Sequence, residues 1–131
     1  MKAKIHRIDK TLPQPKYATA GAVGFDFICR ETVAVASRAL ALIPTNTIIE
    51  IPGGYMLGVL PRSSTPAKKG LMLANSMGVI DNDYCGPDDE IKILVYNFTD
   101  KEVIVERGER IAQGIFFKIG NKSVEFVLPV Y

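Results

Sequence analysis

The chain has 131 residues, of which 47% are hydrophobic and 23% charged, and its 16 basic and 14 acidic side chains give a formal net charge of +2. This length fits a single domain over residues 1–131, and the apolar fraction is too high for a disordered chain. No apolar run approaches the ~18 residues of a membrane helix, and the first residues lack the apolar stretch of a secretory signal. We therefore expect a cytoplasmic protein that binds no membrane and, without a block of basic residues, no nucleic acid.

Cysteine and histidine are too scarce to suggest a metal centre. The two cysteines, Cys29 and Cys85, are too few for a disulfide framework or a four-ligand zinc site. We expect both to be reduced and mostly structural. His6 has no His or Cys near it in the sequence, which favours an ordinary role.

Glycines and prolines alternate with short runs rich in Ile, Val, Leu, Phe and Tyr, which is typical of an all-β barrel or sandwich. The expected strands are Lys2–Ile8, Gly24–Ile28, Ala39–Ile43, Thr45–Ile51, Tyr55–Leu60, Leu71–Ala74, Glu90–Tyr96, Val103–Glu106, Ile111–Ile119 and Ser123–Leu128. Pro52-Gly53-Gly54 supplies turn geometry, so it predicts a hairpin between the strands on either side of it.

The stretch from Pro61 to Gly70 interrupts the β pattern and predicts one short helix. Thr65 is expected at the N-cap and Pro66 at the first helical position, with Gly70 ending the helix. Because a helix N-terminus carries unpaired N–H groups, Arg62 and the serine hydroxyls beside it form a candidate anion site. The alternative is a capped surface turn whose serines bond only to the backbone.

A second stretch, from Asn75 to Gly86, is rich in polar residues. Its first four residues can turn a hairpin, and Val79-Ile80 would return as a strand that carries Asp81 and Tyr84. A carboxylate followed by an aromatic ring suits a site where the acid orients a water and the ring packs on a ligand. Solvated acidic turn residues are the alternative.

A third stretch begins with the polar turn Arg107-Gly108-Glu109-Arg110 and continues as an apolar strand. Gln113 lies within that strand, among apolar neighbours. A glutamine in such a place needs polar partners, which are either a ligand's oxygens or the neighbouring backbone.

In order and spacing, these stretches resemble the motifs of the trimeric dUTPase family, which hydrolyses dUTP to dUMP and pyrophosphate. Gly24-Phe25-Asp26-Phe27 is similar to the first motif, Pro61 through Gly70 to the second, Asn75 through Gly86 to the third and Arg107 to Phe116 to the fourth. The resemblance covers nearly the whole chain. It implies a distorted jelly-roll β-barrel with one short helix, assembled as a homotrimer with active sites between subunits.

The resemblance also implies roles for individual residues. Asp81 corresponds to the catalytic carboxylate that orients the attacking water and touches the sugar 3′-hydroxyl. Tyr84 corresponds to the tyrosine that packs under the deoxyribose and leaves no space for a 2′-hydroxyl. The element that reads uracil corresponds to Asn75, Gly78, Val79 and Ile80. The reaction limits uracil incorporation into DNA and supplies dUMP for thymidylate synthesis.

The triphosphate contacts implied by the resemblance are Arg62, Ser63, Ser64 and Gln113, with Ser64 standing where the family commonly has glycine. Asp26 lies near the metal-bound triphosphate or helps to hold the site together. Arg110 is expected to pair with a carboxylate across a subunit interface rather than touch the substrate. The substrate class implies Mg²⁺, held by phosphates and water with no direct protein ligand.

Two features depart from the family pattern. The sequence contains no Arg-Gly-x-Gly-Gly-Phe-Gly segment, the fifth motif that closes over the phosphates. We expect such a tail to follow Tyr131 in the full protein, the alternative being a member that works without a lid. Gly86-Pro87-Asp88-Asp89-Glu90 is longer than usual. It is interpreted as a hydrated surface turn, with a divalent-ion site as the alternative.

The sequence leaves two alternative functions to consider, a dCTP deaminase and a regulatory protein. The related dCTP deaminases carry a glutamate three residues before the asparagine that ends the strand after the third motif. Counting back from Asn97 gives Leu94, which cannot act as that general base. The other alternative is a catalytically weak, dUTP-binding regulatory protein, which only the missing tail supports.

Overall fold

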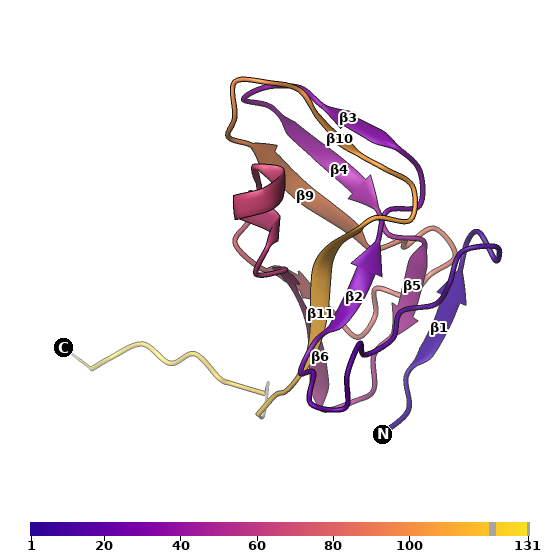
Figure 1. The fold of residues 1–131 in the computed structure, drawn as a ribbon. Helices are drawn as coiled ribbons and strands as arrows, with labels where there is room; N and C mark the ends of the chain where they lie inside the picture. Colours follow the sequence, from indigo (N-terminus) through magenta and orange to yellow (C-terminus); the bar gives the residue numbers. More distant parts are fainter. Residues whose placement is uncertain (121–122, 131) are drawn as a thin grey trace.

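The computed structural model describes residues 1–120 and 123–130. Within them the chain forms β1 (Lys4–Arg7), β2 (Phe25–Ile28), β3 (Val33–Val35), β4 (Leu40–Pro44), β5 (Thr47–Glu50), β6 (Tyr55–Pro61), the helical turn η1 (Thr65–Lys69), β7 (Leu71–Leu73), β8 (Gly78–Ile80), β9 (Lys92–Asn97), β10 (Val103–Val105) and β11 (Arg110–Lys118) (Figure 1). The prediction of an all-β barrel with one short helix is confirmed. None of the described helical residues forms a helix long and apolar enough to span a membrane.

The strands form four small sheets around one apolar core. The sheets have the strand orders β2-β11-β6-β8, β4-β9-β7, β1-β5 and β10-β3. Alternation within the strands fills the core: in β2, Phe25 and Phe27 are buried, and in β9 Ile93 and Val95 are buried. A Cβ on Gly114 of β11 would lie 2.5 Å from the Phe25 ring, so only glycine allows these strands to approach so closely.

Both predicted hairpin turns are present, but the predicted hairpin pairings are wrong. β5 pairs with β1, whereas β6 pairs with β11 and β8, so the turn at residues 52–54 carries the chain into a different sheet. In the same way β7 pairs with β9, while β8 pairs with β6. For the first turn, the physical reason is that both flanks of β6 are occupied, by β11 and β8, so β5 cannot pair with it.

The helix prediction is correct in position but wrong about its cap. Gly70 ends the helix in a left-handed conformation with φ of 71°. Thr65 lies inside the helical turn rather than at its N-cap, and its buried hydroxyl donates to the carbonyl of Ile111 at 2.9 Å. Ser64 takes the cap position without a side-chain capping hydrogen bond. Thr65 therefore fastens the helix to β11.

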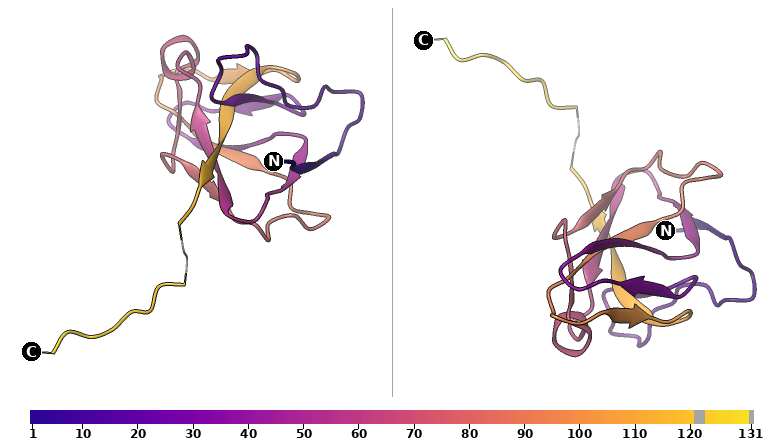
Figure 2. Two further views of the ribbon diagram at one scale, coloured as in Figure 1. Left: turned by 90° about the horizontal axis from the view of Figure 1, so that it is seen from below. Right: turned by 90° about the horizontal axis from the view of Figure 1, so that it is seen from above.

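The predicted strand Ser123–Leu128 is also wrong. Residues 123–130 form no strand and extend away from the barrel (Figure 2). Phe126 and Leu128 are 95% and 91% exposed, because no strand of the same chain lies beside them. In contrast, the short strand β3 was not predicted, since its pairing with β10 is a tertiary feature.

Both cysteines are free thiols, as predicted. Cys29 is buried, and its Sγ donates to the carbonyl of Glu31 at 2.8 Å. Burial raises the pKa of this thiol to about 11, so it stays protonated at neutral pH. Cys29 therefore acts as a small core residue, whereas Cys85 is exposed.

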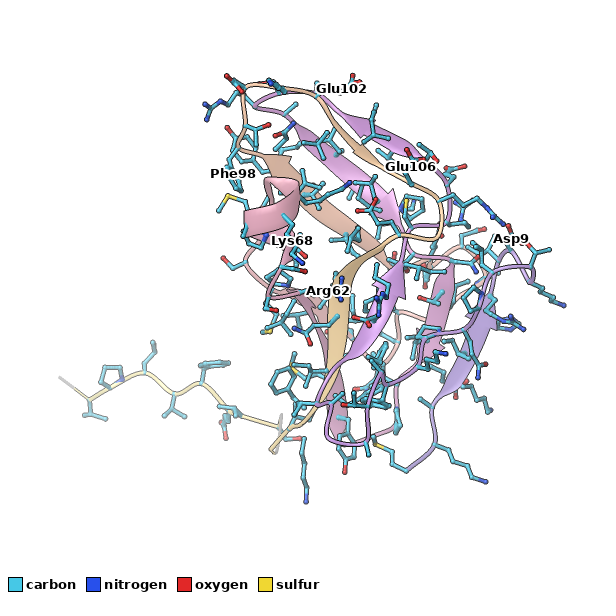
Figure 3. All side chains as sticks on the ribbon, in the orientation of Figure 1. Asp9, Arg62, Lys68, Phe98, Glu102 and Glu106 are labelled. Carbon is cyan, nitrogen blue, oxygen red and sulfur yellow. The ribbon has the colours of Figure 1, made fainter. Side chains whose placement is uncertain are left out.

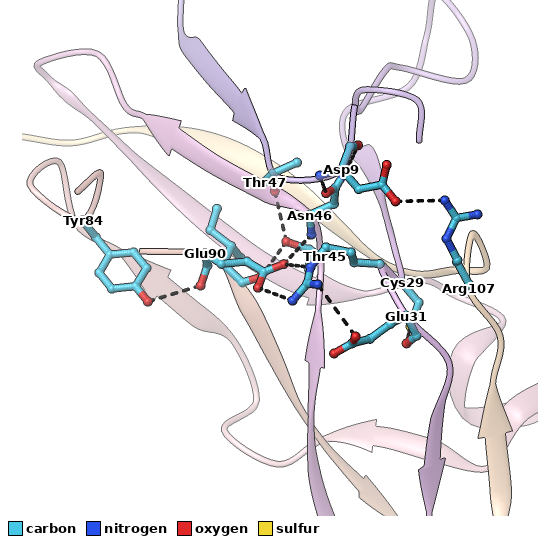
Figure 4. Close-up of polar contacts among 11 residues, drawn as sticks. Asp9, Cys29, Glu31, Thr45, Asn46, Thr47, Tyr84, Glu90 and Arg107 are labelled. Carbon is cyan, nitrogen blue, oxygen red and sulfur yellow. Dashed lines mark hydrogen bonds and ion pairs between the residues drawn. The ribbon is translucent and has the colours of Figure 1, made fainter. Parts of the chain in front are cut away.

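Asp9 fastens the segment after β1 to two distant parts of the fold. Its backbone N–H donates to Asn46 Oδ1 at 2.6 Å, and its carbonyl accepts from Asn46 Nδ2 at 2.9 Å. Its carboxylate accepts from the Thr11 hydroxyl at 2.6 Å. It also accepts from Arg107 at 3.0 Å (Figure 4). Hydrogen bonds from Thr11 and Arg107 lower the pKa of Asp9 to about 2.

This lowered pKa predicts a pH-dependent contribution of Asp9 to stability. The ionised form is favoured in the folded state, so the contribution is complete above the ordinary value of 3.8 and is lost as the pH falls to about 2. In urea unfolding, Asp9→Asn should be less stable than wild type near neutral pH, and the difference should shrink as the pH falls. A difference that does not change with pH would contradict this assignment.

Candidate functional site

A pocket of about 250 Å³ opens between η1 and the turn before β11. The helical segment contributes Ser64, Lys68 and Lys69, and the turn contributes Glu109 and Arg110. Arg62 also lines the pocket and lies on the same side of the molecule as Lys68 (Figure 3). Four cations face one carboxylate, and that carboxylate is paired with Lys69 at 3.0 Å. The pocket is therefore suited to a polyanion.

Asp26 holds two arginines at the edge of this basic pocket. Its Oδ1 lies 3.1 Å from Arg62 Nε, and its Oδ2 lies 3.4 Å from Arg110 Nη1. Arg62 Nη1 also donates to the carbonyl of Arg110 at 3.4 Å. Of the two roles open to Asp26, the geometry supports holding the site together. Arg110 finds a carboxylate within its own chain, and a partner across an interface stays a prediction.

Gln113 lies on β11, between the neighbouring strands β2 and β6. Its Nε2 donates to the carbonyl of Pro61 at 3.0 Å, so its amide has a backbone partner. A Cβ on Gly24 would lie 2.3 Å from Gln113 Oε1, which means that glycine leaves the space the amide occupies. One N–H of the amide remains for a ligand. The phosphate contact of Gln113 stays a prediction.

The predicted phosphate-binding serines occupy different places. Ser64 lines the basic pocket, and its side chain makes no capping hydrogen bond. Ser63 is exposed and does not line the pocket in this chain. The structure therefore brings together Arg62, Ser64 and Arg110, with Asp26 beside them, and leaves Ser63 outside the group.

The residues predicted to read uracil line a second, smaller pocket of about 130 Å³. All four of them, Asn75, Gly78, Val79 and Ile80, are among its lining residues. Gly78 lies opposite Val59 in the β6–β8 ladder, and a Cβ on Gly78 would come within 3.1 Å of the Val59 Cβ. Glycine therefore allows the close approach of β8 to β6 that forms one wall of this pocket.

Asp81 and Tyr84 follow β8 directly but do not line this second pocket. The carboxylate of Asp81 is exposed and has no hydrogen-bond partner among the described residues. Tyr84 is 39% exposed, and its hydroxyl donates to the carbonyl of Glu90 at 3.3 Å. The two pockets share no lining residue. Within one chain, the predicted site is therefore divided into two parts.

The interpretation of residues 86–90 as a hydrated turn is wrong for Glu90. This side chain is buried, and its carboxylate accepts from Arg30 Nε at 2.8 Å and from the backbone N–H of Asn46 at 2.8 Å (Figure 4). The hydrogen bond to Glu90 raises the pKa of Arg30. Asp89 caps the turn by accepting from Gly86 N at 2.8 Å, whereas Asp88 is exposed.

Glu90 was missed because it occupies an outward position in the alternating pattern of the following strand. Its burial depends on Arg30, 60 residues earlier in the chain, which no local pattern reveals. Asn82 was missed for a similar reason, since its partners Ile51, Pro52 and Tyr55 lie in another part of the sequence.

The described residues contain no group of three or more His, Cys, Asp or Glu side chains placed to hold a metal ion. The carboxylates beside the basic pocket are paired with cations, Asp26 with Arg62 and Glu109 with Lys69. That Mg²⁺ is held by phosphate oxygens and water, with no direct protein ligand, stays a prediction.

These features define a small all-β barrel with a basic pocket and a second, smaller pocket. Comparisons with known proteins give the family. A family model described as dUTPase matches residues 10–130. The deoxyuridine 5′-triphosphate nucleotidohydrolase of Hydrogenobaculum sp. (strain Y04AAS1) is 42% identical over 120 residues, which cover 91% of this chain and 81% of that protein.

Two further comparisons agree. The enzyme of the same name from Lactococcus lactis subsp. lactis (strain IL1403) is 46% identical over 105 residues, covering 78% of this chain and 70% of that protein. The crystal structure of dUTPase from Streptococcus mutans matches with a TM-score of 0.83 and 35% identity, covering 92% of this chain and 98% of that chain. The chain belongs to the dUTPase family, which confirms the resemblance and the barrel class.

The partly buried pair of Arg30 and Glu90 predicts a compensable stability effect. Arg30→Met should lower the free energy of unfolding by about 3 kcal/mol, the lower end for breaking a buried ion pair, because the buried Glu90 carboxylate loses a charged partner that is itself partly exposed. Arg30→Met combined with Glu90→Gln should recover much of this loss, since the amide oxygen still accepts from Asn46 N. Urea unfolding of the two variants and wild type tests this. A double variant no more stable than Arg30→Met would contradict it.

Proposed function

We propose that this chain hydrolyses dUTP to dUMP and pyrophosphate by attack of water on the α-phosphorus. The observation that carries the proposal is the basic pocket beside η1 in a chain of the dUTPase family. We place the reaction in the cytoplasm, because the free thiols of Cys29 and Cys85 fit a reducing compartment. The reaction would limit uracil incorporation into DNA and supply dUMP for thymidylate synthesis.

In this proposal the basic pocket binds the triphosphate. Arg62 and Ser64 contact phosphate oxygens, and Asp26 keeps the Arg62 guanidinium in place before the substrate arrives. Positive groups fixed in advance stabilise the charge that develops during phosphoryl transfer without reorganising at that moment. Mg²⁺ bound to the phosphates neutralises part of the same charge.

Asp81 is the proposed general base. Its carboxylate is exposed and free of hydrogen bonds among the described residues, so it is available to hold a water in line with the α-phosphorus. Tyr84 packs its ring under the deoxyribose. Because the Tyr84 hydroxyl is held by the carbonyl of Glu90, the ring cannot retreat easily from a 2′-hydroxyl.

The second pocket accounts for the choice of base. Its backbone groups at residues 75–80 present hydrogen-bond donors and acceptors in an order that matches uracil. Cytosine would leave some of these groups without a partner, and each unpaired group would cost about 1–3 kcal/mol of binding free energy. Leu94 also lines this pocket. An apolar residue there argues against deamination, because it cannot activate water.

We also propose that the protein is a homotrimer. Cross-strand registers place Leu40, Tyr96 and Met72 in one row of the β4-β9-β7 sheet, with Leu42 and Leu94 in the next. Leu40, Leu42 and Met72 are 61%, 55% and 45% exposed, so the outer face of this sheet is apolar. Packing of copies on this face would bring the two pockets of neighbouring chains together.

The trimer predicts the effect of a charge on this face. Leu42→Asp should leave the barrel folded but reduce the mass measured by size exclusion with light scattering from three chains to one. The dUTPase activity should fall with it, because the site is divided between chains. Ile104→Asp, an exposed position on β10, is the matched control and should remain trimeric. An unchanged mass for Leu42→Asp would contradict the interface.

The catalytic role of Asp81 gives the direct test of function. With Mg²⁺ and dUTP, wild type should release pyrophosphate, whereas dCTP and dTTP should be poor substrates. Asp81→Asn should reduce kcat by about 10²–10⁴-fold, the usual share of a general base. Asp88→Asn is the matched control, because Asp88 is an exposed acid of the neighbouring turn. Tight dUTP binding without pyrophosphate release by wild type would instead favour the regulatory alternative.

A further inference from the structure

The loop Asp81–Tyr84 is fastened to a neighbouring turn by one of its own side chains. Asn82 Nδ2 lies 3.2 Å from the carbonyl oxygen of Ile51, 3.1 Å from that of Pro52 and 3.0 Å from that of Tyr55. These carbonyls surround the turn that joins β5 to β6. Asn82 therefore links the loop to a part of the chain about 30 residues earlier.

Only a side chain that donates hydrogen bonds can bind these three carbonyl oxygens. The asparagine amide has two N–H bonds, and three carbonyl oxygens lie within hydrogen-bond distance of its nitrogen. Both N–H bonds therefore point at acceptors, and at least one is shared between two of them. The residues on either side of it are Asp81 and Asp83, whose ionised carboxylates only accept hydrogen bonds. A carboxylate in place of the Asn82 amide would face three oxygens and be repelled.

Two further hydrogen bonds within the loop connect its other residues to Asp81 and Asn82. The backbone N–H of Tyr84 donates to the carbonyl of Asp81 at 3.2 Å, and Cys85 Sγ donates to the carbonyl of Asn82 at 3.6 Å. The strand β8 ends at Ile80, so the β6–β8 ladder does not hold Asp81 itself. The Asn82 side chain is then the contact nearest to Asp81 that ties it to the barrel.

We propose that Asn82 is a positioning residue that sets the place of Asp81 and Tyr84 together. The inference rests on the proposed function, because it assigns those two residues to water activation and sugar selection. Asn82 touches neither water nor sugar in this scheme. Its loss should therefore reduce turnover and also weaken the selection of dUTP over UTP, since the Asn82 side chain holds the backbone of the loop that carries both residues, whereas the Glu90 carbonyl holds only the Tyr84 hydroxyl.

The test compares Asn82→Ala and Asn82→Asp with wild type. The aspartate keeps the size of the side chain but replaces the N–H donors with a second acceptor oxygen and adds a negative charge, whereas the alanine removes the donors without adding charge. In both variants kcat for dUTP should fall about 100-fold, the cost of misplacing a catalytic group by about 1 Å. The preference for dUTP over UTP in kcat/KM should fall about tenfold or more. Asp88→Ala on the same turn should leave both values unchanged.

Amide hydrogen exchange gives a readout that does not depend on catalysis. Exchange at residues 82–85 should accelerate at least tenfold in both variants, while the amides of β9 and β11 keep their protection. Unchanged exchange, or a loss of protection spread over all strands, would contradict a positioning role. So would a fall in kcat with unchanged preference for dUTP over UTP. If wild type fails to hydrolyse dUTP, the proposed function falls, and the exchange experiment still decides whether Asn82 holds the loop.

Discussion

The antiparallel pairing of β11 with both β2 and β6 is the constraint on which the rest of this structure depends. Residues 110–118 lie between two strands that are far away in sequence, and Gly114 allows the Phe25 and Phe27 rings to pack against them. This one pairing brings Asp26, Arg62 and Arg110 to the same end of the sheet. The basic pocket is thus a consequence of strand register, and a shift by one residue would turn these side chains away from each other.

The same sheet also explains why the site is incomplete in one chain. The flank of β6 that does not face β11 is taken by β8, which ends where the proposed catalytic loop begins. The pocket proposed for uracil therefore forms beside β8 and β9, whereas the basic pocket forms beside η1 and β11. A barrel that buries its core this way leaves one face of β4-β9-β7 apolar and exposed. In the proposed trimer, covering that face with neighbouring copies would also complete the site.

Much of the fold was predictable because its signals are local. The alternation of apolar residues in β9 is visible within a short stretch of chain, and it predicts the strand. Proline at residue 66 and glycine at residue 70 predict the start and the end of the helical turn in the same local way. The hairpin pairings failed because a turn sequence fixes the reversal of the chain and not the strand that each arm will meet. The predictions for Thr65 and Glu90 were wrong for the same reason. Their partners, Ile111 and Arg30, lie 46 and 60 residues away in the sequence.

The candidate site divides its polar residues between structure and chemistry. Within residues 81–90, the Asn82 amide holds the turn, Asp89 caps it and Glu90 anchors it to Arg30. Each of these side chains makes hydrogen bonds within the fold. Asp81 alone, of the loop residues implicated in catalysis, keeps a carboxylate without a partner among the described residues. A carboxylate can remain unpaired and in a fixed place only when its neighbours supply the bonds that hold the backbone, and this loop is built in that way.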